Sequence, residues 1–184
     1  KYTALTPNLK GLENALDSQV DEVAVFAAAS ETFSQKNVNC SITESLVRFE
    51  DIFKKAGQKK IPVRGYVSCI VECPYEGKVM PDKVLEVTSR LLDMGCYEVS
   101  LGDTIGKGTP KTVEALLKVI CESLKVEQLA GHFHDTSNTA IKNVEVGLKY
   151  GITTFDTAIG GLGGCPYAPG AKGNLSTFKL INAF

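Results

Sequence analysis

The only two histidines of the 184-residue chain, His132 and His134, are separated by one residue and are followed by Asp135 and Thr136. In a β-strand, residues i and i+2 point to the same face, so both imidazoles would face the same way. Imidazole is the commonest side-chain metal ligand, and the spacing therefore favours a metal site over two histidines packed in a core. Because no second pair of cysteines lies nearby, a harder cation that also takes oxygen ligands is the expected metal.

A glycine-rich segment, residues 160–174, carries a second candidate group, the thiol of Cys165. Glycine tolerates positive φ and lets a backbone approach a ligand closely. Such a segment suits a mobile lid over a site. A plain flexible connection is the alternative interpretation, and a cysteine set among glycines and prolines favours the lid.

Other polar groups follow further predicted strands. Asp103, within Leu-Gly-Asp-Thr, could bind a ligand or cap the turn that follows, and both interpretations stay open. Cys69 and Cys73 fit the lining of a pocket and simple packing equally well. Arg64 lies inside a predicted strand and needs a partner if it is buried, but the sequence does not identify that partner.

Six short apolar or β-branched runs alternate with helical patterns and would position these groups. The runs cover residues 2–5, 23–29, 63–69, 97–101, 129–134 and 153–159. Continuous apolar runs are typical of parallel strands that are buried on both faces. The polar groups stand at the ends of the last four runs, and sites in α/β folds form at the carboxyl ends of parallel strands.

The helical patterns have recognisable ends. They cover residues 42–53, 81–94, 110–124 and 137–150. Ser41 with Glu44 forms a capping box before the first, and Thr109 caps the third, which has Pro110 as its first residue. Strand and helix alternate, so the chain has an α/β fold with a parallel sheet. Six strands suit either an open sheet or an incomplete (β/α)₈ barrel, which needs eight.

Composition limits the classes of function. Hydrophobic residues make up 43% and charged residues 22% of the chain, as in ordinary globular domains. The net charge of −1 argues against non-specific nucleic-acid binding, and the longest apolar stretches are too short to cross a bilayer. The six cysteines do not form a compact disulfide framework, so reduced thiols are expected. No linker is visible, and residues 1–184 are predicted to form one domain.

Taken together, several stretches resemble the 3-hydroxy-3-methylglutaryl-CoA (HMG-CoA) lyase family. They are residues 5–8, 63–69, 73–77, 100–104, 132–136 and 161–168. The His-x-His strand is shared with related Claisen-type condensing enzymes and is weak evidence by itself. The Cys-Pro-Tyr-Ala sequence in the glycine-rich segment and the Cys-Pro-Tyr-Glu-Gly turn are far more specific.

This resemblance implies an enzyme, a carbon–carbon lyase that cleaves HMG-CoA into acetyl-CoA and acetoacetate with Mg²⁺ or Mn²⁺. That reaction belongs to ketone-body formation and leucine degradation. The implied metal ligands are His132, His134 and Asn174, the implied catalytic residues are Cys165 and His132, and the implied substrate-binding residues are Asp103, Gly163 and Gly164.

The resemblance also implies a TIM barrel that is incomplete here, with about six βα units corresponding to strands 3 to 8. The Arg-Asp pair of the family's first strand, whose aspartate completes the metal site, has no match, so we expect the isolated chain to be poorly active. The expected partner is a CoA thioester, with no nucleic acid and no membrane, and a homodimer is left open. The expected compartment is the mitochondrial matrix or the cytoplasm.

Two alternatives remain beside the lyase. The first is a condensing relative of the isopropylmalate or citramalate synthase type, against which the Cys-Pro-Tyr-Ala sequence argues. The second is a non-catalytic, truncated partner of a full-length subunit. Coding sequence for an Arg-Asp strand upstream of this chain would exclude that second alternative.

Overall fold

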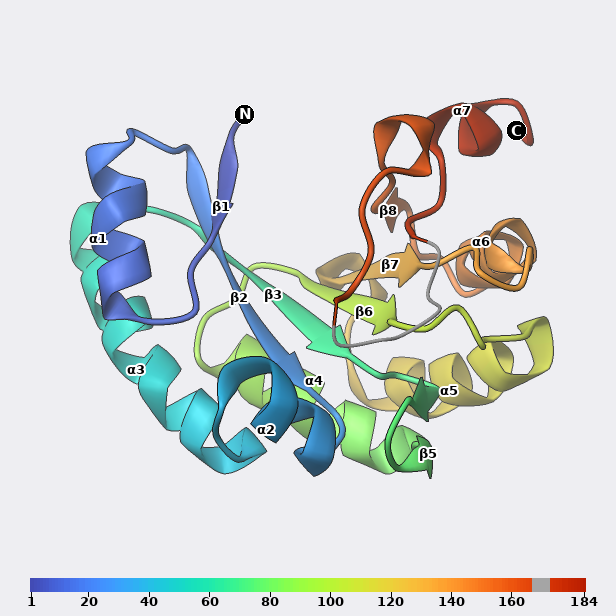
Figure 1. Cartoon of the computed structure of the whole chain (residues 1–184), viewed down its shortest axis with the longest axis horizontal. Helices are drawn as coiled ribbons and strands as arrows, with labels where there is room; N and C mark the ends of the chain where they lie inside the picture. Colours follow the sequence, from blue (N-terminus) through green and yellow to red (C-terminus); the bar gives the residue numbers. More distant parts are fainter. Residues whose placement is uncertain (167–172) are drawn as a thin grey trace.

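A six-stranded parallel sheet organises the chain in the computed structural model, which describes residues 1–166 and 173–184 (Figure 1). The strands are β1 (Thr3–Leu5), β2 (Glu22–Ala28), β3 (Val63–Ser68), β6 (Val99–Asp103), β7 (Leu129–Phe133) and β8 (Thr154–Phe155). Their order in the sheet is their order along the chain, β1-β2-β3-β6-β7-β8. This sequential order is that of a (β/α)₈ barrel, whereas a doubly wound sheet reverses its strand order. The predicted incomplete barrel is therefore confirmed.

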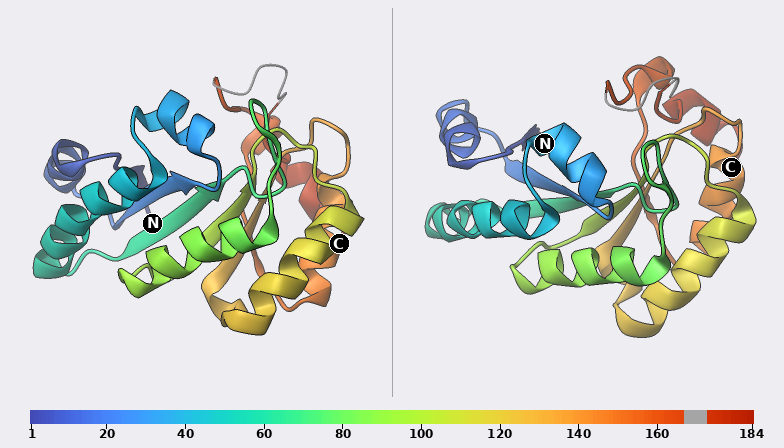
Figure 2. Two further views of the ribbon diagram at one scale, coloured as in Figure 1. Left: turned by 90° about the horizontal axis from the view of Figure 1, so that it is seen from below. Right: turned by 60° about the horizontal axis from the view of Figure 1, so that its bottom comes forward.

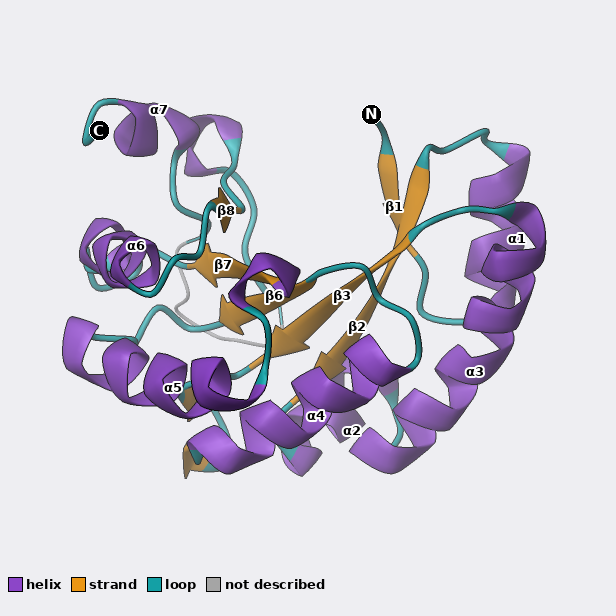
Figure 3. Cartoon of the chain, turned by 180° about the vertical axis from the view of Figure 1, so that it is seen from behind, coloured by secondary structure: helices purple, strands orange, loops and turns teal. Residues whose placement is uncertain are grey.

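Helices alternate with the strands of this curled sheet. They are α1 (Leu9–Asp17), α2 (Glu31–Val38), α3 (Ile42–Lys59), α4 (Pro81–Asp93), α5 (Pro110–Ser123), α6 (Ala140–Lys149) and α7 (Thr177–Ile181), with 3₁₀ turns at Val126–Gln128 and Ile159–Gly161. Helices α3 to α6 follow the convex side in order, whereas α2 lies on the opposite side of the sheet (Figure 2). A small antiparallel hairpin, β4 (Glu72–Cys73) and β5 (Gly77–Lys78), follows β3 (Figure 3).

The helix ends predicted from capping residues are confirmed. The Ser41 hydroxyl accepts the N–H of Glu44 at 3.1 Å, and the Glu44 carboxylate accepts the N–H of Ser41 at 2.8 Å. Thr109 caps α5 in the same way, with Pro110 as the first helical residue. Across the described residues, none of the helices combines the length and the apolar composition that a membrane crossing requires.

The helix expected from near Ser137 begins later, at Ala140. The preceding residues form a turn, in which Asn138 has a φ of 55° and donates its N–H to the carbonyl of Asp135 at 3.0 Å. The carboxylate of Asp135 then accepts the N–H of Ala140 at 3.2 Å. An aspartate at the end of β7 thus sets the start of α6, and the prediction from the serine was wrong.

The last strand is also shorter than the predicted run 153–159, since β8 contains only Thr154–Phe155. The N–H of Asp156 still donates into β7, at 2.8 Å. Beyond it, Ala158 donates its N–H to the carbonyl of Leu175 at 3.0 Å instead. The chain leaves the sheet after Asp156 because its backbone hydrogen bonds go to the segment that follows the glycine-rich region.

Phe155 fixes this edge of the sheet. Its ring is enclosed by Gly131 of β7 and Gly147 of α6. A Cβ atom at Gly131 would lie 2.8 Å from Cδ1 of Phe155, and one at Gly147 would lie 2.9 Å from its Cε1. Both glycines thus leave the room that this ring needs between β7 and α6, beside the strand that Asp156 follows.

We predict that Gly131→Ala lowers the free energy of unfolding by about 1–3 kcal/mol, the usual cost of overpacking a core. The measurement is urea denaturation. Gly57→Ala is the matched control, because Gly57 lies in α3 and a Cβ there meets nothing within 4 Å. That control should raise the free energy of unfolding by about 0.5–1 kcal/mol. Equal stability of the two variants would contradict the enclosed position of Phe155.

Candidate active site

A cavity of about 400 Å³ opens at the carboxyl ends of the central strands. Its polar wall is formed by Tyr66, Ser68, Thr104, His132, His134 and Asn174. Its apolar wall is formed by Leu5, Ala24, Phe26, Phe33 and Val67. The prediction that the polar strand ends meet at one site is confirmed, because residues that end or follow β3, β6 and β7 border the same cavity.

The two histidines lie next to each other in the lining of this cavity. The Nε2 atoms of His132 and His134 are 3.3 Å apart, and their ring centroids are 5.2 Å apart. His134 is buried, and His132 is half-buried. Both imidazoles therefore present the same nitrogen to one point, as their i and i+2 spacing on β7 predicts.

The donor set fits a divalent cation in part. With Nδ1 of His132 directed at a carboxylate, its Nε2 lone pair is available on the cavity side. Within the described residues, the buried Nδ1 of His134 has no hydrogen-bond partner, whereas a histidine that ligates a metal usually donates its second ring N–H to one, so this histidine fits the cation site less well than His132 does. No three His, Cys, Asp or Glu side chains of the described part gather closely enough to hold a metal. The two imidazoles need oxygen ligands in addition.

Asn174 supplies such an oxygen beside the histidines. Its backbone bridges to His134, and the two side chains share a hydrogen bond. The Asn174 amide nitrogen donates to the carbonyl of Leu162 at 2.9 Å, which orients the amide. Gly163, with a φ of 92°, leaves the space that this amide nitrogen needs, since a Cβ there would lie 3.0 Å from it.

Cys165 and Gly164 border the same cavity, and Cys165 is half-buried. The structure thus brings five of the predicted site residues to one cavity: His132, His134, Asn174, Gly164 and Cys165. Gly163 lies next to them against the amide of Asn174. Tyr167 and Ala168, the last two residues of the Cys-Pro-Tyr-Ala sequence, lie outside the described residues.

Asp103 is placed differently from the other predicted site residues. Its side chain is 0% exposed, and it is absent from the described lining of the cavity. Its carboxylate accepts the N–H of Lys107 at 3.2 Å and that of Gly108 at 2.7 Å. These hydrogen bonds show that Asp103 caps the turn, and binding of a ligand by Asp103 stays a prediction. Burial raises the pKa of Asp103 to about 6, although these N–H donors act in the opposite direction.

The open question about Cys69 and Cys73 is answered in favour of packing. Both are buried, and neither borders the cavity described above. The Cys69 N–H donates to the hydroxyl of Thr104 at 2.8 Å, and Ser30 donates its hydroxyl to the Cys73 sulfur at 3.0 Å. Burial raises the pKa of the Cys69 thiol.

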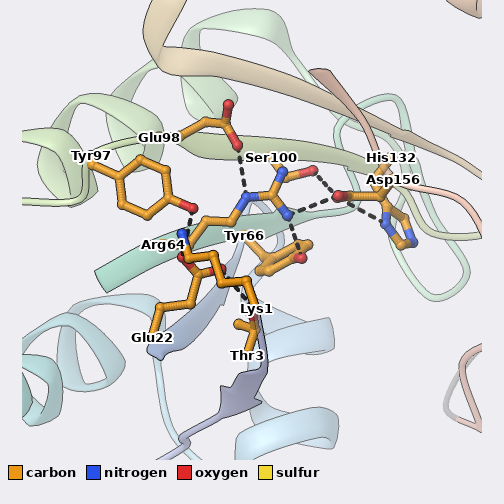
Figure 4. Close-up of polar contacts among 10 residues, drawn as sticks. All are labelled: Lys1, Thr3, Glu22, Arg64, Tyr66, Tyr97, Glu98, Ser100, His132 and Asp156. Atoms are coloured by element: carbon orange, nitrogen blue, oxygen red, sulfur yellow. Dashed lines mark hydrogen bonds and ion pairs between the residues drawn. The ribbon is translucent and has the colours of Figure 1, made fainter. Parts of the chain in front are cut away.

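An ion cluster beside the cavity was not identified from the sequence (Figure 4). The side chain of Arg64 is 8% exposed. Its Nε donates to Glu98 at 2.7 Å, and one terminal nitrogen donates to Asp156 at 2.8 Å and also contacts the hydroxyl of Tyr66. Asp156 additionally accepts the Ser100 hydroxyl at 2.6 Å. The available signal was a charged residue, Asp156, inside an apolar run predicted as a buried strand.

The cluster and the histidines influence each other's ionisation. Burial opposes ionisation of Asp156, but hydrogen bonds from His132 and Ser100 and the charge of Arg64 outweigh it and lower the pKa of Asp156. Burial and the neighbouring His132 lower the pKa of His134 to about 4, against a smaller opposing effect of Asn174. The site therefore combines a neutral imidazole with an ionised carboxylate near neutral pH.

Comparison with known proteins gives consistent matches. Residues 2–184 match the family model described as HMGL-like. The cytoplasmic 3-hydroxy-3-methylglutaryl-CoA lyase of Rattus norvegicus is 52% identical over 181 residues. The mitochondrial hydroxymethylglutaryl-CoA lyase of Bos taurus is 53% identical over 180 residues. The crystal structure of hydroxymethylglutaryl-CoA lyase from Pseudomonas aeruginosa matches with a TM-score of 0.95 at 53% identity.

These matches cover nearly all of this chain but only part of each relative. The two curated relatives are aligned over 98% of this chain and over 53% and 55% of their own lengths. The P. aeruginosa structure is matched over 99% of this chain and 61% of its own chain. The chain thus spans little more than half the length of the curated relatives.

We predict that Asp103 makes stability depend on pH in the direction opposite to an ion-paired carboxylate. Its pKa is raised to about 6 in the folded state, so the folded chain binds this proton more tightly than the unfolded chain does. The associated stability is present below pH ~4 and is lost as the pH rises through about 6, a change of roughly 3 kcal/mol.

The measurement is the difference in unfolding free energy between the unmodified chain and Asp103→Asn, followed from about pH 4 to pH 7. As the pH rises to about 6, the unmodified chain should lose stability relative to Asp103→Asn. Above that pH the difference between the two should stay constant. The same series with Asp82→Asn, at an exposed position of α4, gives the baseline. A difference independent of pH would show that the N–H donors of Lys107 and Gly108 compensate fully for burial.

Proposed function

Because this chain belongs to the HMGL-like family, we propose that the protein that carries it cleaves HMG-CoA into acetyl-CoA and acetoacetate. The observation that supports this most strongly is the convergence of His132, His134, Asn174 and Cys165 on one cavity at the carboxyl ends of the strands. These four residues come from two segments that are separated in sequence. Two relatives, which are 52% and 53% identical to the chain, are named as lyases of this substrate, and their names support this choice of reaction.

We assign the cation site to His132, His134 and Asn174, with Mg²⁺ or Mn²⁺ as the expected ion. A bound divalent cation would polarise the tertiary hydroxyl of the substrate and stabilise the negative charge that develops on its oxygen. Two imidazoles and one amide carry no negative charge, so a further anionic ligand is needed for a hard cation.

The reaction needs two proton transfers, and the chain supplies a group for the second. A general base in the site takes the hydroxyl proton, the oxygen forms a carbonyl, and the adjacent carbon–carbon bond breaks, which leaves acetoacetate. The electron pair of that bond passes to the departing carbon, which becomes the enolate of acetyl-CoA and must take up a proton. We assign that proton to the thiol of Cys165, delivered directly or through a water that it positions.

The walls of the cavity suit a thioester of this kind. Phe26 and Phe33 contribute apolar surface to the same cavity as the histidines and would help to exclude water from the enolate. The glycine-rich segment that carries Gly164 and Cys165 borders the opening. We propose a CoA thioester as the substrate and, from the names of the relatives, the mitochondrial matrix or the cytoplasm as the compartment.

We predict metal-dependent release of acetoacetate from HMG-CoA. The assay compares the 184-residue chain with the natural protein that carries it. Each is measured with Mg²⁺ and with Mn²⁺, and a chelator serves as the control. Cys165→Ala should lower the rate by about 10²–10⁴, the usual contribution of a positioned proton donor. Cys121→Ala is the matched control, a half-buried thiol of α5 that does not border the cavity.

The outcomes separate the proposal from its alternatives. Absence of cleavage by a folded, cation-loaded natural protein would reject the lyase assignment. Condensation of acetyl-CoA with a keto acid by that protein would replace it with the synthase reaction. An equal rate for Cys165→Ala and Cys121→Ala would remove the thiol from the reaction while leaving the lyase activity in place.

A further inference from the structure

Asp156 lies between the buried ion cluster and the first histidine of the site. Its Oδ1 accepts from Arg64 at 2.8 Å, and its Oδ2 accepts the Ser100 hydroxyl at 2.6 Å. The same Oδ2 is 3.3 Å from Nδ1 of His132 (Figure 4). The other ring nitrogen of His132 faces the cavity, toward His134. Asp156 itself does not border the cavity in the described lining.

We propose that Asp156 is a positioning residue that fixes the tautomer and the ring orientation of His132. The carboxylate holds the proton of His132 on Nδ1, and the Nε2 lone pair is thereby kept on the cavity side. This inference rests on the proposed function in one respect, that a cation is the group which uses this lone pair. Its first part, the tautomer of His132, stands independently of any cation.

The carboxylate is suited to this task because its own position is determined from three sides. Arg64 approaches one oxygen and Ser100 the other, so neither oxygen is free to rotate away. The backbone of Asp156 donates to the carbonyl of Gly131 at 2.8 Å, which fixes it beside β7. An ionised carboxylate is required, since the guanidinium of Arg64 donates to it and Oδ2 accepts from two donors.

The free histidine side chain usually carries its proton on Nε2, so the structure must impose the other tautomer. An acceptor placed at Nδ1 does this, because only a protonated Nδ1 can donate to Asp156. A ligand held in this way by a carboxylate is also more basic. Loss of such a partner typically weakens metal binding by about 10- to 100-fold.

The first experiment reads the tautomer directly in the unmodified chain without metal. A long-range ¹H–¹⁵N correlation spectrum at about pH 8 distinguishes protonated from unprotonated ring nitrogens. The chain has two histidines, and His134→Asn assigns the signals of His132. We expect a protonated Nδ1 and an unprotonated Nε2 in His132, and the reverse in Asp156→Asn. A protonated Nε2 in the unmodified chain would overturn the proposal.

The second experiment titrates Mn²⁺ alone and follows its paramagnetic resonance signal. Asp156→Asn should weaken binding by about 10- to 100-fold. Ser100→Ala removes only the hydroxyl that anchors Oδ2 and should weaken binding less, in the same direction. This second variant keeps the test valid where Asp156→Asn does not fold. Unchanged Mn²⁺ affinity in both variants would overturn the positioning role.

Glu98→Gln is the matched control. Glu98 contacts the same guanidinium as Asp156, at 2.7 Å, but touches neither histidine. It should therefore lower stability while leaving the His132 spectrum and the Mn²⁺ affinity unchanged, and equal effects of Glu98→Gln and Asp156→Asn would overturn the proposal. Absence of Mn²⁺ binding by the unmodified chain, with the expected His132 tautomer, would count against the proposed cation site and leave the positioning by Asp156 supported.

Discussion

The buried guanidinium of Arg64 imposes the constraint on which the remaining site geometry depends. A buried charge without partners costs several kcal/mol, so this side chain is tolerated only where carboxylates meet it. Those partners, Glu98 and Asp156, lie directly before β6 and directly after β8. Arg64 on β3 can therefore be buried only where β6 and β8 bring these two carboxylates to its guanidinium. The cluster links residues of β3, β6 and β7 and the residues beside them (Figure 4).

The cavity follows from that register. Tyr66 lies opposite Ser100 in the sheet, and Gly102 lies opposite His132, so polar side chains from β3, β6 and β7 converge. Phe155, whose ring packs closely against Gly131 and Gly147, anchors the edge strand that Asp156 follows. Packing on the outer side and charge pairing on the inner side thus determine the same geometry. The backbone bridge between His134 and Asn174 connects the glycine-rich segment, which carries Cys165, to the end of β7.

Much of this organisation could be predicted from the sequence because periodicity carries it. The i and i+2 spacing of the histidines required both rings to face one side, and the capping residues Ser41 and Thr109 marked real helix starts. The motif resemblance to the lyase family is confirmed by the family match over residues 2–184. Helices α1 and α2 were not predicted, although Asn8 and Ser30 cap them; α2 has only a weak apolar stripe, whereas the stripe of α1 was overlooked.

The parts that could not be predicted depend on contacts between distant segments. The partners of Arg64 are 34 and 92 residues away in sequence, and no local pattern identifies them. The burial of Asp103 likewise depends on how the following loop folds back onto its carboxylate. The start of α6 was placed wrongly because the cap comes from Asp135, five residues before the N–H that it accepts.

The most direct test of the account is a double-mutant cycle between Arg64→Met and Asp156→Asn, with the free energy of unfolding measured by urea denaturation. Arg64→Met leaves buried carboxylates without their cation, and Asp156→Asn removes one charge from the same pair. The account predicts that the double variant is more stable than the sum of the single effects implies, with a coupling energy of about 1–3 kcal/mol. Additive effects would show that the two side chains act independently, and would contradict the claim that this ion pair holds the sheet and the site together.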